Sequence, residues 1–174
     1  MVEQTDSILF SGVFDVTELN KDGKRFDRVD RIHGKRLNSD MTLIMDFNSE
    51  LFPIAAGDRL TVDIASSILP KAKTTAAGAG ASAAGGAAGK AGASVSAEAA
   101  MNQAAEWREI GKRPTLADHY DYVMFGKVYR FDEASDSQVS VYISYGGMLM
   151  NLTGEHTHLN QMSIGDNVYL LMRR

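Results

Sequence analysis

The sequence predicts an all-β protein that folds as a single domain over residues 1–174, as an antiparallel barrel or sandwich. Short apolar and aromatic runs recur along the chain, and turn-forming pairs such as Gly-Asp and Gly-Gly separate them. Strands spaced this closely favour pairing between neighbours in antiparallel sheets. With 44% hydrophobic residues, the chain also has enough apolar surface for one buried core.

Four strands are expected in the first part of the chain. Residues 8–16 and the apolar positions of 26–32 lie on either side of the turn signal Lys21-Asp22-Gly23-Lys24, which indicates a hairpin. Residues 41–47 are mostly apolar and indicate a strand that is largely buried. Residues 60–65 alternate apolar with polar side chains, so we expect a strand with one solvent-exposed face.

Residues 71–105 differ in composition from the rest of the chain, since they consist mainly of alanine, glycine and serine. Such a segment buries too little apolar surface to offset the entropy of ordering it. Each glycine also opposes helix formation by about 1 kcal/mol. We therefore expect a long disordered insertion between the two halves of the domain.

Four further strands are expected after the insertion. They are indicated by the apolar segments 120–131, 139–145, 148–152 and 168–172. An apolar strand, a loop and a Gly-Asp pair before a last strand occur at 41–65 and again at 148–172. This echo indicates two related halves, although Gly-Asp is common turn chemistry.

Charge is distributed unevenly along the chain. The net charge is −4, yet residues 21–36 carry seven basic and three acidic side chains, which leaves −8 for the rest. This basic segment suits a phosphate backbone or an acidic protein surface, or is simply a solvated face. The side chains expected to contact phosphates are Lys24, Arg25, Arg28, Arg31, Lys35 and Arg36. Because Val29 is expected to face the core, replacing Arg28 and Arg31 should spare the fold.

No set of residues favours a catalytic or metal site. The chain contains no cysteine, which excludes thiolate ligands and disulfides and fits a reducing compartment. His156 and His158 would share a metal ion only on one strand face, and their polar, turn-like surroundings favour a solvated loop. No apolar run is long enough to span a membrane, and the first residues are not typical of a secretion signal. We expect no cofactor, no metal and no membrane partner.

Aromatic residues are concentrated in the second part of the chain. On a barrel face such side chains stack nucleobases, but the same residues also fill cores and protein interfaces. The sequence leaves both interpretations open for Tyr120, Tyr122, Phe125, Tyr129, Tyr142 and Tyr145.

Three motifs occur in a fixed order in this second part. They are Asp121-Tyr122-Val123-Met124-Phe125-Gly126-Lys127-Val128-Tyr129-Arg130, Ser144-Tyr145-Gly146-Gly147-Met148-Leu149-Met150 and Tyr169-Leu170-Leu171-Met172-Arg173-Arg174. Together they closely resemble the family of the eighth subunit common to nuclear RNA polymerases I, II and III. The first part is also similar, over residues 8–16, 48–53 and 60–67. The resemblance covers nearly all of the chain outside the insertion.

The resemblance implies a closed antiparallel barrel of about eight strands, related to the oligonucleotide-binding fold, with a long loop between its halves. It also implies a structural and assembly subunit without enzymatic activity, located in the nucleus, including the nucleolus. The implied partners are the largest subunit of RNA polymerases I, II and III and the rest of the polymerase core. Weak binding of single-stranded DNA is implied for the basic segment, at about residues 20–43.

The matched motifs are expected to contribute both core and docking surface, because alternate residues of a strand serve opposite faces. Adjacent Gly146 and Gly147 are expected to allow positive φ or a close backbone approach. The expected subunit-interface residues are Tyr122, Met124, Gly126, Tyr129, Tyr145, Gly146, Gly147 and Met150. A free-standing module that binds single-stranded nucleic acid is the alternative function, and a small hydrolase is a more distant one.

Overall fold

The structure is a computed structural model that describes residues 7–21, 23, 26–37, 39–69, 106–133 and 137–174. The predicted insertion at 71–105 lies outside the described residues, as do Lys24 and Arg25 of the basic segment.

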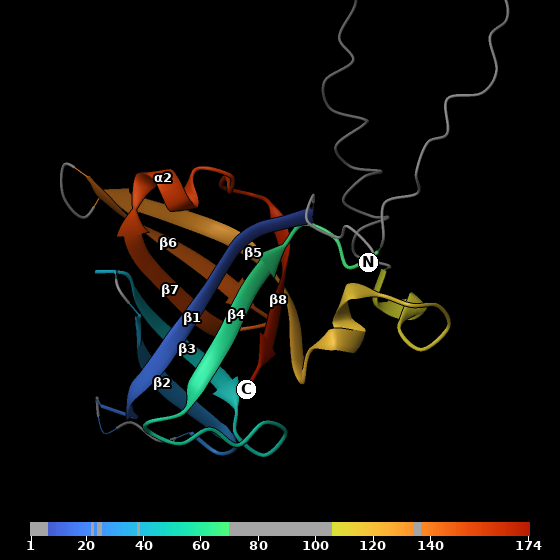
Figure 1. Ribbon diagram of the computed structural model, residues 1–174, viewed down its shortest axis with the longest axis horizontal. Coiled ribbons are helices and arrows are strands. Elements are labelled where there is room, and N and C mark those ends of the chain that lie inside the picture. The colour runs from blue at the N-terminus through green and yellow to red at the C-terminus, as the bar shows by residue number, and fades with distance from the viewer. Residues whose placement is uncertain (1–6, 22, 24–25, 38, 70–105, 134–136) are drawn as a thin grey trace, which may run out of the picture.

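The described chain is built almost entirely from strands, which Figure 1 shows wrapped around a common axis. Each of the strand segments predicted from sequence overlaps one of them. The strands are β1 (Ile8–Leu19), β2 (Val29–Arg36), β3 (Thr42–Asn48), β4 (Arg59–Ala65), β5 (Tyr122–Glu133), β6 (Gln138–Tyr145), β7 (Met148–Glu155) and β8 (Asn167–Arg173).

The strands close into one antiparallel barrel in the order β1-β2-β3-β7-β6-β5-β8-β4. The predicted all-β, closed antiparallel barrel is therefore confirmed. The pairing pattern repeats between the two halves of the chain, because β1 pairs with β2 and β4 just as β5 pairs with β6 and β8. The halves join where β3 meets β7 and β4 meets β8.

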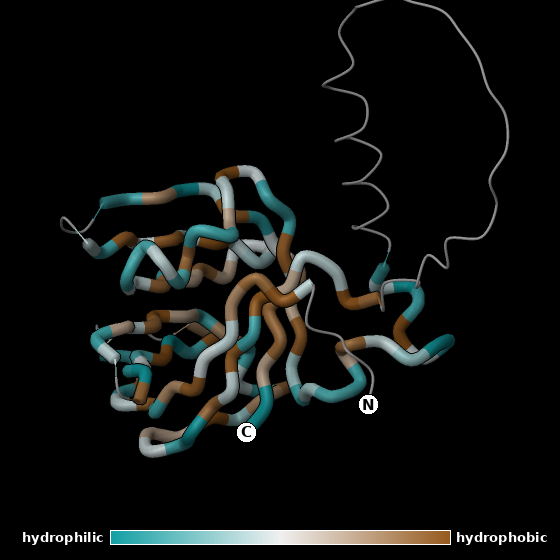
Figure 2. Tube along the Cα trace, turned by 45° about the horizontal axis from the view of Figure 1, so that its top comes forward, coloured by the Kyte–Doolittle hydropathy of each residue, from teal (hydrophilic) through white to brown (hydrophobic). Residues whose placement is uncertain are grey.

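The barrel interior is filled by apolar side chains. Alternation along the strands directs every second residue inward, and Figure 2 shows hydrophobic residues spaced along the strands accordingly. Phe14 and Phe47 are among the largest fully buried side chains, and Met150 and Leu152 of β7 pack in the same cluster. The interior is thus a packed core.

A second apolar cluster lies outside the barrel, where the short 3-10 helices η2 (Glu106–Glu109) and η3 (Leu116–His119) follow the insertion. Leu116 and Ala117 pack there against Ala65 and Tyr169. The expectation of one solvent-exposed face for β4 is therefore wrong, because Asp63 and Ala65 are buried as well as the inward-facing residues. The sequence pattern of β4 does not reveal that Leu116 and Ala117 cover its outer face, because they follow the insertion and lie far away in the chain.

Two carboxylates hold residues 106–120, which we call the covering segment, on the barrel. The Glu106 side chain accepts hydrogen bonds from the Ser67 hydroxyl at 2.8 and 2.9 Å and from the Ile68 backbone N–H at 2.9 Å. At the other end, the Tyr120 hydroxyl donates to the buried carboxylate of Asp63. Residues on both sides of the insertion are therefore fastened to each other and to β4.

Candidate docking face

A hollow of about 170 Å³ lies on the outer face of the barrel, across the strands β2, β3, β7, β6 and β5. It brings together side chains from both predicted site regions, namely Arg31 of the basic segment and Tyr129 of the interface motif. The residues that line it are Arg31, Ile44, Tyr129, Tyr142, Leu149, Met150 and Asn151. We call this region the docking face.

One side of the docking face is aromatic. The rings of Tyr129 and Tyr142 lie 6.1 Å apart, tilted by 51°, and Tyr129 is 45% exposed. The Arg130 guanidinium lies 5.3 Å from the centre of the Tyr142 ring and is paired with Asp132 at 2.7 Å. The hydrogen bond and ion pair with Asp132 raise the pKa of the Arg130 side chain above its ordinary value.

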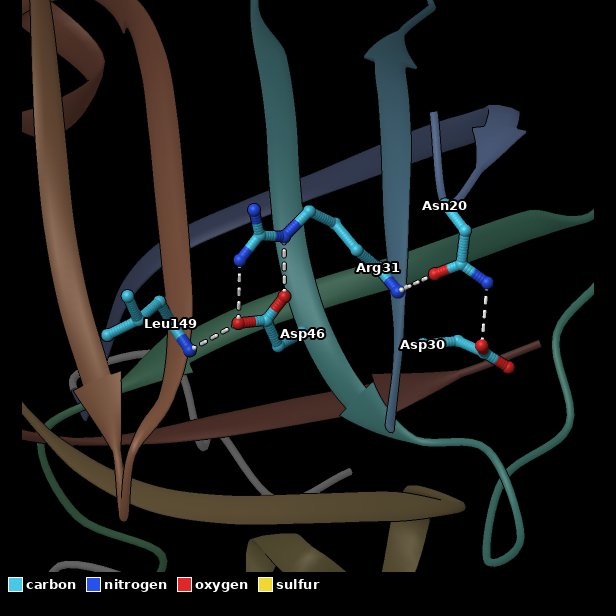
Figure 3. A network of polar contacts seen from close by, with 5 residues as sticks. All are labelled: Asn20, Asp30, Arg31, Asp46 and Leu149. Carbon is cyan, nitrogen blue, oxygen red and sulfur yellow. Dashed lines mark hydrogen bonds and ion pairs between the residues drawn. The ribbon is translucent and has the colours of Figure 1, made fainter. Parts of the chain in front are cut away.

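The other side is polar and ordered by one ion pair, which Figure 3 shows. Arg31 of β2 donates two hydrogen bonds to Asp46 of β3, from Nε at 2.6 Å and from Nη2 at 3.1 Å. Asp46 also accepts a hydrogen bond from the Leu149 backbone N–H of β7 at 3.2 Å. Asn20 accepts from the Arg31 backbone N–H and donates to Asp30, so the network reaches the end of β1. Three neighbouring strands are thereby tied together at the rim of the hollow.

The β6–β7 turn lies close to the docking face, because Leu149 follows Gly147 by two positions. Gly146 and Gly147 form a two-residue connection with φ values of 62° and 103°, and both are exposed. Of the two expectations for these glycines, positive φ is confirmed, whereas no close approach is found, because no atom of the described residues lies within 4 Å of a Cβ added at either position. Positive φ at both positions is typical of the type I′ turn that suits a tight hairpin.

The predicted interface residues divide between the core and the surface. Tyr122, Met124, Gly126, Tyr145 and Met150 are buried, although Met150 also lines the hollow. Tyr129, Gly146 and Gly147 are exposed and are the members of the predicted set that a partner reaches directly. Which of these residues dock stays a prediction.

The described residues of the basic segment are mostly engaged with carboxylates. Arg28 has positive φ, at 62°, and lies 3.4 Å from Glu50. Lys35 is 3.9 Å from Asp40, and both side chains are exposed. Arg36 donates to the Ser11 carbonyl at 3.4 Å and lies over the Phe10 ring. These neighbours offset part of the positive charge that the sequence alone indicates.

The expectation that Val29 faces the core is wrong. The buried positions of β2 are Ile32 and Gly34, so Val29 shares the outer face with Arg31. Replacing Arg31 therefore removes an ion pair instead of altering a free surface charge. The sequence offered no signal for the pair of Arg31 and Asp46, because Asp46 lies in the apolar segment 41–47 and Arg31 lies in the basic segment.

The docking face also contains residues outside the predicted site, namely Ile44, Tyr142, Leu149 and Asn151. They are outward-facing positions of strands that the sequence identified only as apolar.

His156 and His158 lie in the short helix α2 (His156–Leu159), not in the expected loop, and both are exposed. Within the described ranges, no group of three or more His, Asp or Glu side chains is arranged to hold a metal ion. No helix in the described part of the chain is long and apolar enough to cross a membrane.

A closed eight-stranded barrel with a filled interior and a hollow on its outer face defines a small β-barrel protein. Comparison with known proteins makes this specific. The chain belongs to the RNA polymerase Rpb8 family, whose model matches residues 11–174.

Relatives match over almost their whole length. The DNA-directed RNA polymerases I, II, and III subunit RPABC3 of Saccharomyces cerevisiae is 39% identical over 171 residues, which cover 95% of this chain and 97% of the relative. The Schizosaccharomyces pombe protein of the same name is 31% identical over 98% of this chain and 99% of its own length. The DNA-directed RNA polymerases II, IV and V subunit 8B of Arabidopsis thaliana is 30% identical, with 96% of each chain covered. The resemblance stated from the sequence motifs is confirmed.

Proposed function

We propose that this protein is a non-catalytic structural and assembly subunit of the nuclear RNA polymerases I, II and III, located in the nucleus, including the nucleolus. It docks mainly on the largest subunit and contacts the rest of the polymerase core. The near full-length similarity to subunits named for those three polymerases supports the assignment.

The docking face is the observation that carries the proposed mode of action. Its hollow combines exposed apolar and aromatic surface, at Tyr129 and Leu149, with the fixed charge of Arg31. Interfaces characteristically combine an apolar centre with a polar rim. The exposed Gly146-Gly147 turn lies beside this hollow and extends the surface beyond the barrel wall. We assign the contact with the largest subunit to the hollow and this turn together.

Co-purification from the organism's own cells tests this assignment. The Gly146→Asn substitution separates docking from folding, because asparagine tolerates a φ of 62° and Asn-Gly is favoured in a type I′ turn. We expect unchanged stability and reduced recovery of the largest subunit. Gly23→Asn is the matched control, since Gly23 also has positive φ and no atom lies within 4 Å of its added Cβ.

Two outcomes count against the proposal, and they differ. If the parent chain recovers no polymerase subunits, the assembly role is wrong. If the Gly146→Asn variant recovers the largest subunit at the parental level, the assembly role stands but the turn is not part of the contact.

Weak binding of single-stranded DNA is the second activity that we propose, through Arg28, Lys35 and Arg36. All three lie in the basic segment, and contacts from such side chains to phosphates read no sequence. The carboxylates of Glu50 and Asp40 lie beside two of these residues, which keeps the expected affinity low.

Fluorescence anisotropy with a labelled oligonucleotide at low salt tests the DNA contact. Replacing Arg28, Lys35 and Arg36 by alanine should weaken binding and make it less sensitive to salt. Arg31 is kept intact because its loss would disturb the ion pair with Asp46. Equal binding by parent and triple variant would identify the segment as a solvated or protein-docking surface.

A further inference from the structure

An exposed aromatic patch lies on the segment that follows the insertion. Trp107, the chain's one tryptophan, is 56% exposed, and Ile110 is 44% exposed. The Ile110 backbone N–H donates to the Trp107 carbonyl, so a single turn presents both side chains. In Figure 1 this segment lies to one side of the barrel, beyond β5 and β8. We call Trp107, Ile110 and the neighbouring Arg108 and Lys112 the tryptophan patch.

The chain is anchored to the barrel on both sides of the patch. Directly before Trp107, Glu106 is hydrogen-bonded to Ser67 and Ile68, and further on the Leu116 backbone N–H donates to the Ile68 carbonyl at 2.7 Å. Leu116 itself is buried in the outer apolar cluster. Anchoring on both sides reduces the backbone freedom that the segment loses on binding, and tryptophan is enriched among residues that dominate interface energies.

The patch is also positively charged on an acidic protein. Residues 107–113 carry three basic side chains and one acidic side chain, whereas the rest of the chain sums to −6. Glu109 is paired with Arg113 at 3.1 Å. Among the described residues, Arg108 and Lys112 have no carboxylate partner, and Arg108 lies 5.3 Å from the centre of the Trp107 ring. The complementary surface is therefore apolar with carboxylates around it.

We infer that the tryptophan patch is a second docking site, separate from the docking face, for an acidic segment with a large apolar side chain on another polymerase subunit. The inference rests on the proposed function, because it takes the partner from the polymerase. A protein suits the patch better than a nucleic acid. Ile110 offers no ring for base stacking, and two unpaired cations on an acidic body give little support to a phosphate backbone.

Photo-cross-linking in the intact assembly tests the inference. The tagged full-length chain, carrying p-benzoylphenylalanine at position 107, is purified with its polymerase, irradiated and mapped by mass spectrometry. We expect cross-links to an Asp- or Glu-rich segment of one polymerase subunit. In parallel, Trp107→Ser should weaken the binding of that subunit's cross-linked segment, as a synthetic peptide, about 30-fold or more, whereas Trp107→Phe should weaken it less. Lys112→Glu alone should also weaken peptide binding at low salt, and Lys112→Arg is its control.

Each other outcome overturns the inference. Recovery of the polymerase without a cross-link from position 107 would leave the assembly role intact and remove the second site. Cross-links to nucleic acid, or to residues 70–105 of the same chain, would assign the patch to a different occupant. Recovery of no polymerase from the parent chain would overturn the proposed function and this inference together. Thermal unfolding of the free variants shows whether each one still folds.

Discussion

Arg31 and Asp46 face each other directly across β2 and β3 and are joined by two hydrogen bonds, at 2.6 and 3.1 Å. The Asp46 side chain is only 13% exposed, and it also accepts from the Leu149 backbone N–H. One carboxylate therefore links three strands at the edge of the docking face.

Removing this carboxylate should destabilise the barrel. We expect Asp46→Ala to lower the free energy of unfolding by about 1–3 kcal/mol, because a partly buried guanidinium and a backbone N–H lose their acceptor. Urea denaturation at pH 7 measures the effect. Asp40→Ala is the control, since its pair with Lys35 is exposed on both sides and should contribute less than about 0.5 kcal/mol. Equal losses in the two variants would contradict the prediction.

The contact between Tyr120 and Asp63 should hold the covering segment on β4. Tyr120→Phe removes the hydroxyl and leaves a carboxylate that is 4% exposed without that donor. We expect a loss of about 2 kcal/mol in unfolding free energy. In a double-mutant cycle with Asp63→Asn, the second change should then cost much less than it does alone. Additive losses would show that the two groups act independently.

Alkaline pH should weaken the fold through Tyr145, whose phenol is fully buried and donates to the Met150 sulfur at 3.7 Å. Burial raises the pKa of Tyr145 above its ordinary value, so the folded state keeps a proton that the unfolded state releases above about pH 10. The stability contribution is therefore complete below pH 10 and is lost as the pH rises further. Relative to the parent, Tyr145→Phe should gain about 1.4 kcal/mol between pH 8 and pH 11. Urea denaturation at both pH values measures this difference, and a constant difference would contradict it.

Gly126 should tolerate no side chain. A Cβ at this position would collide with the Ser144 carbonyl oxygen on the paired strand β6 and with the Tyr145 ring. We expect Gly126→Ala to cost about 2 kcal/mol or more in unfolding free energy. Gly34→Ala is the matched control in a strand interior, because its Cβ meets its nearest atom at an ordinary 3.4 Å. Thermal unfolding of both variants distinguishes the collision from a general effect of removing glycine.

Shortening the insertion should hardly change stability. The chain on either side of it is joined by the Glu106 contacts with Ser67 and Ile68, so its length affects only loop-closure entropy. Replacing residues 74–97 by a short Gly/Ser linker should change the unfolding free energy by less than about 1 kcal/mol. Glu106→Ala in the full chain should cost more, about 1–3 kcal/mol. A large fall in the melting temperature of the shortened chain would show that the insertion contributes to packing.

The strands were predictable from the sequence because their signals are local. Alternation and turn residues located β3 and the β6–β7 hairpin to within a few residues. The burial of both faces of β4 was not predictable in this way, since its cover is supplied by residues that follow the insertion. The inward face of β2 was also misassigned, because Val29 and Ile32 are both apolar and only closure of the barrel decides between them.

The candidate site was predictable only in part, for a related reason. The motif around Gly146-Gly147 and the basic segment were visible as runs of sequence, and each contributes to the docking face. The hollow itself is lined by residues from five strands, three of them from β7 and one each from the other four. Nothing in any one run indicates that Ile44 and Asn151 lie beside Tyr142, because their proximity follows from the strand order.

Closure of the barrel limits how another protein associates with it. Every strand from β1 to β8 is hydrogen-bonded to a neighbour on both sides, so the barrel that the structure describes leaves no strand edge to which a foreign strand can be added. Association therefore depends on side chains and turns that the backbone ladder does not constrain. Substitutions at such positions can retune one contact at a time while the scaffold stays the same. Such a barrel suits the proposed role, in which one polypeptide serves as a subunit of three related polymerases.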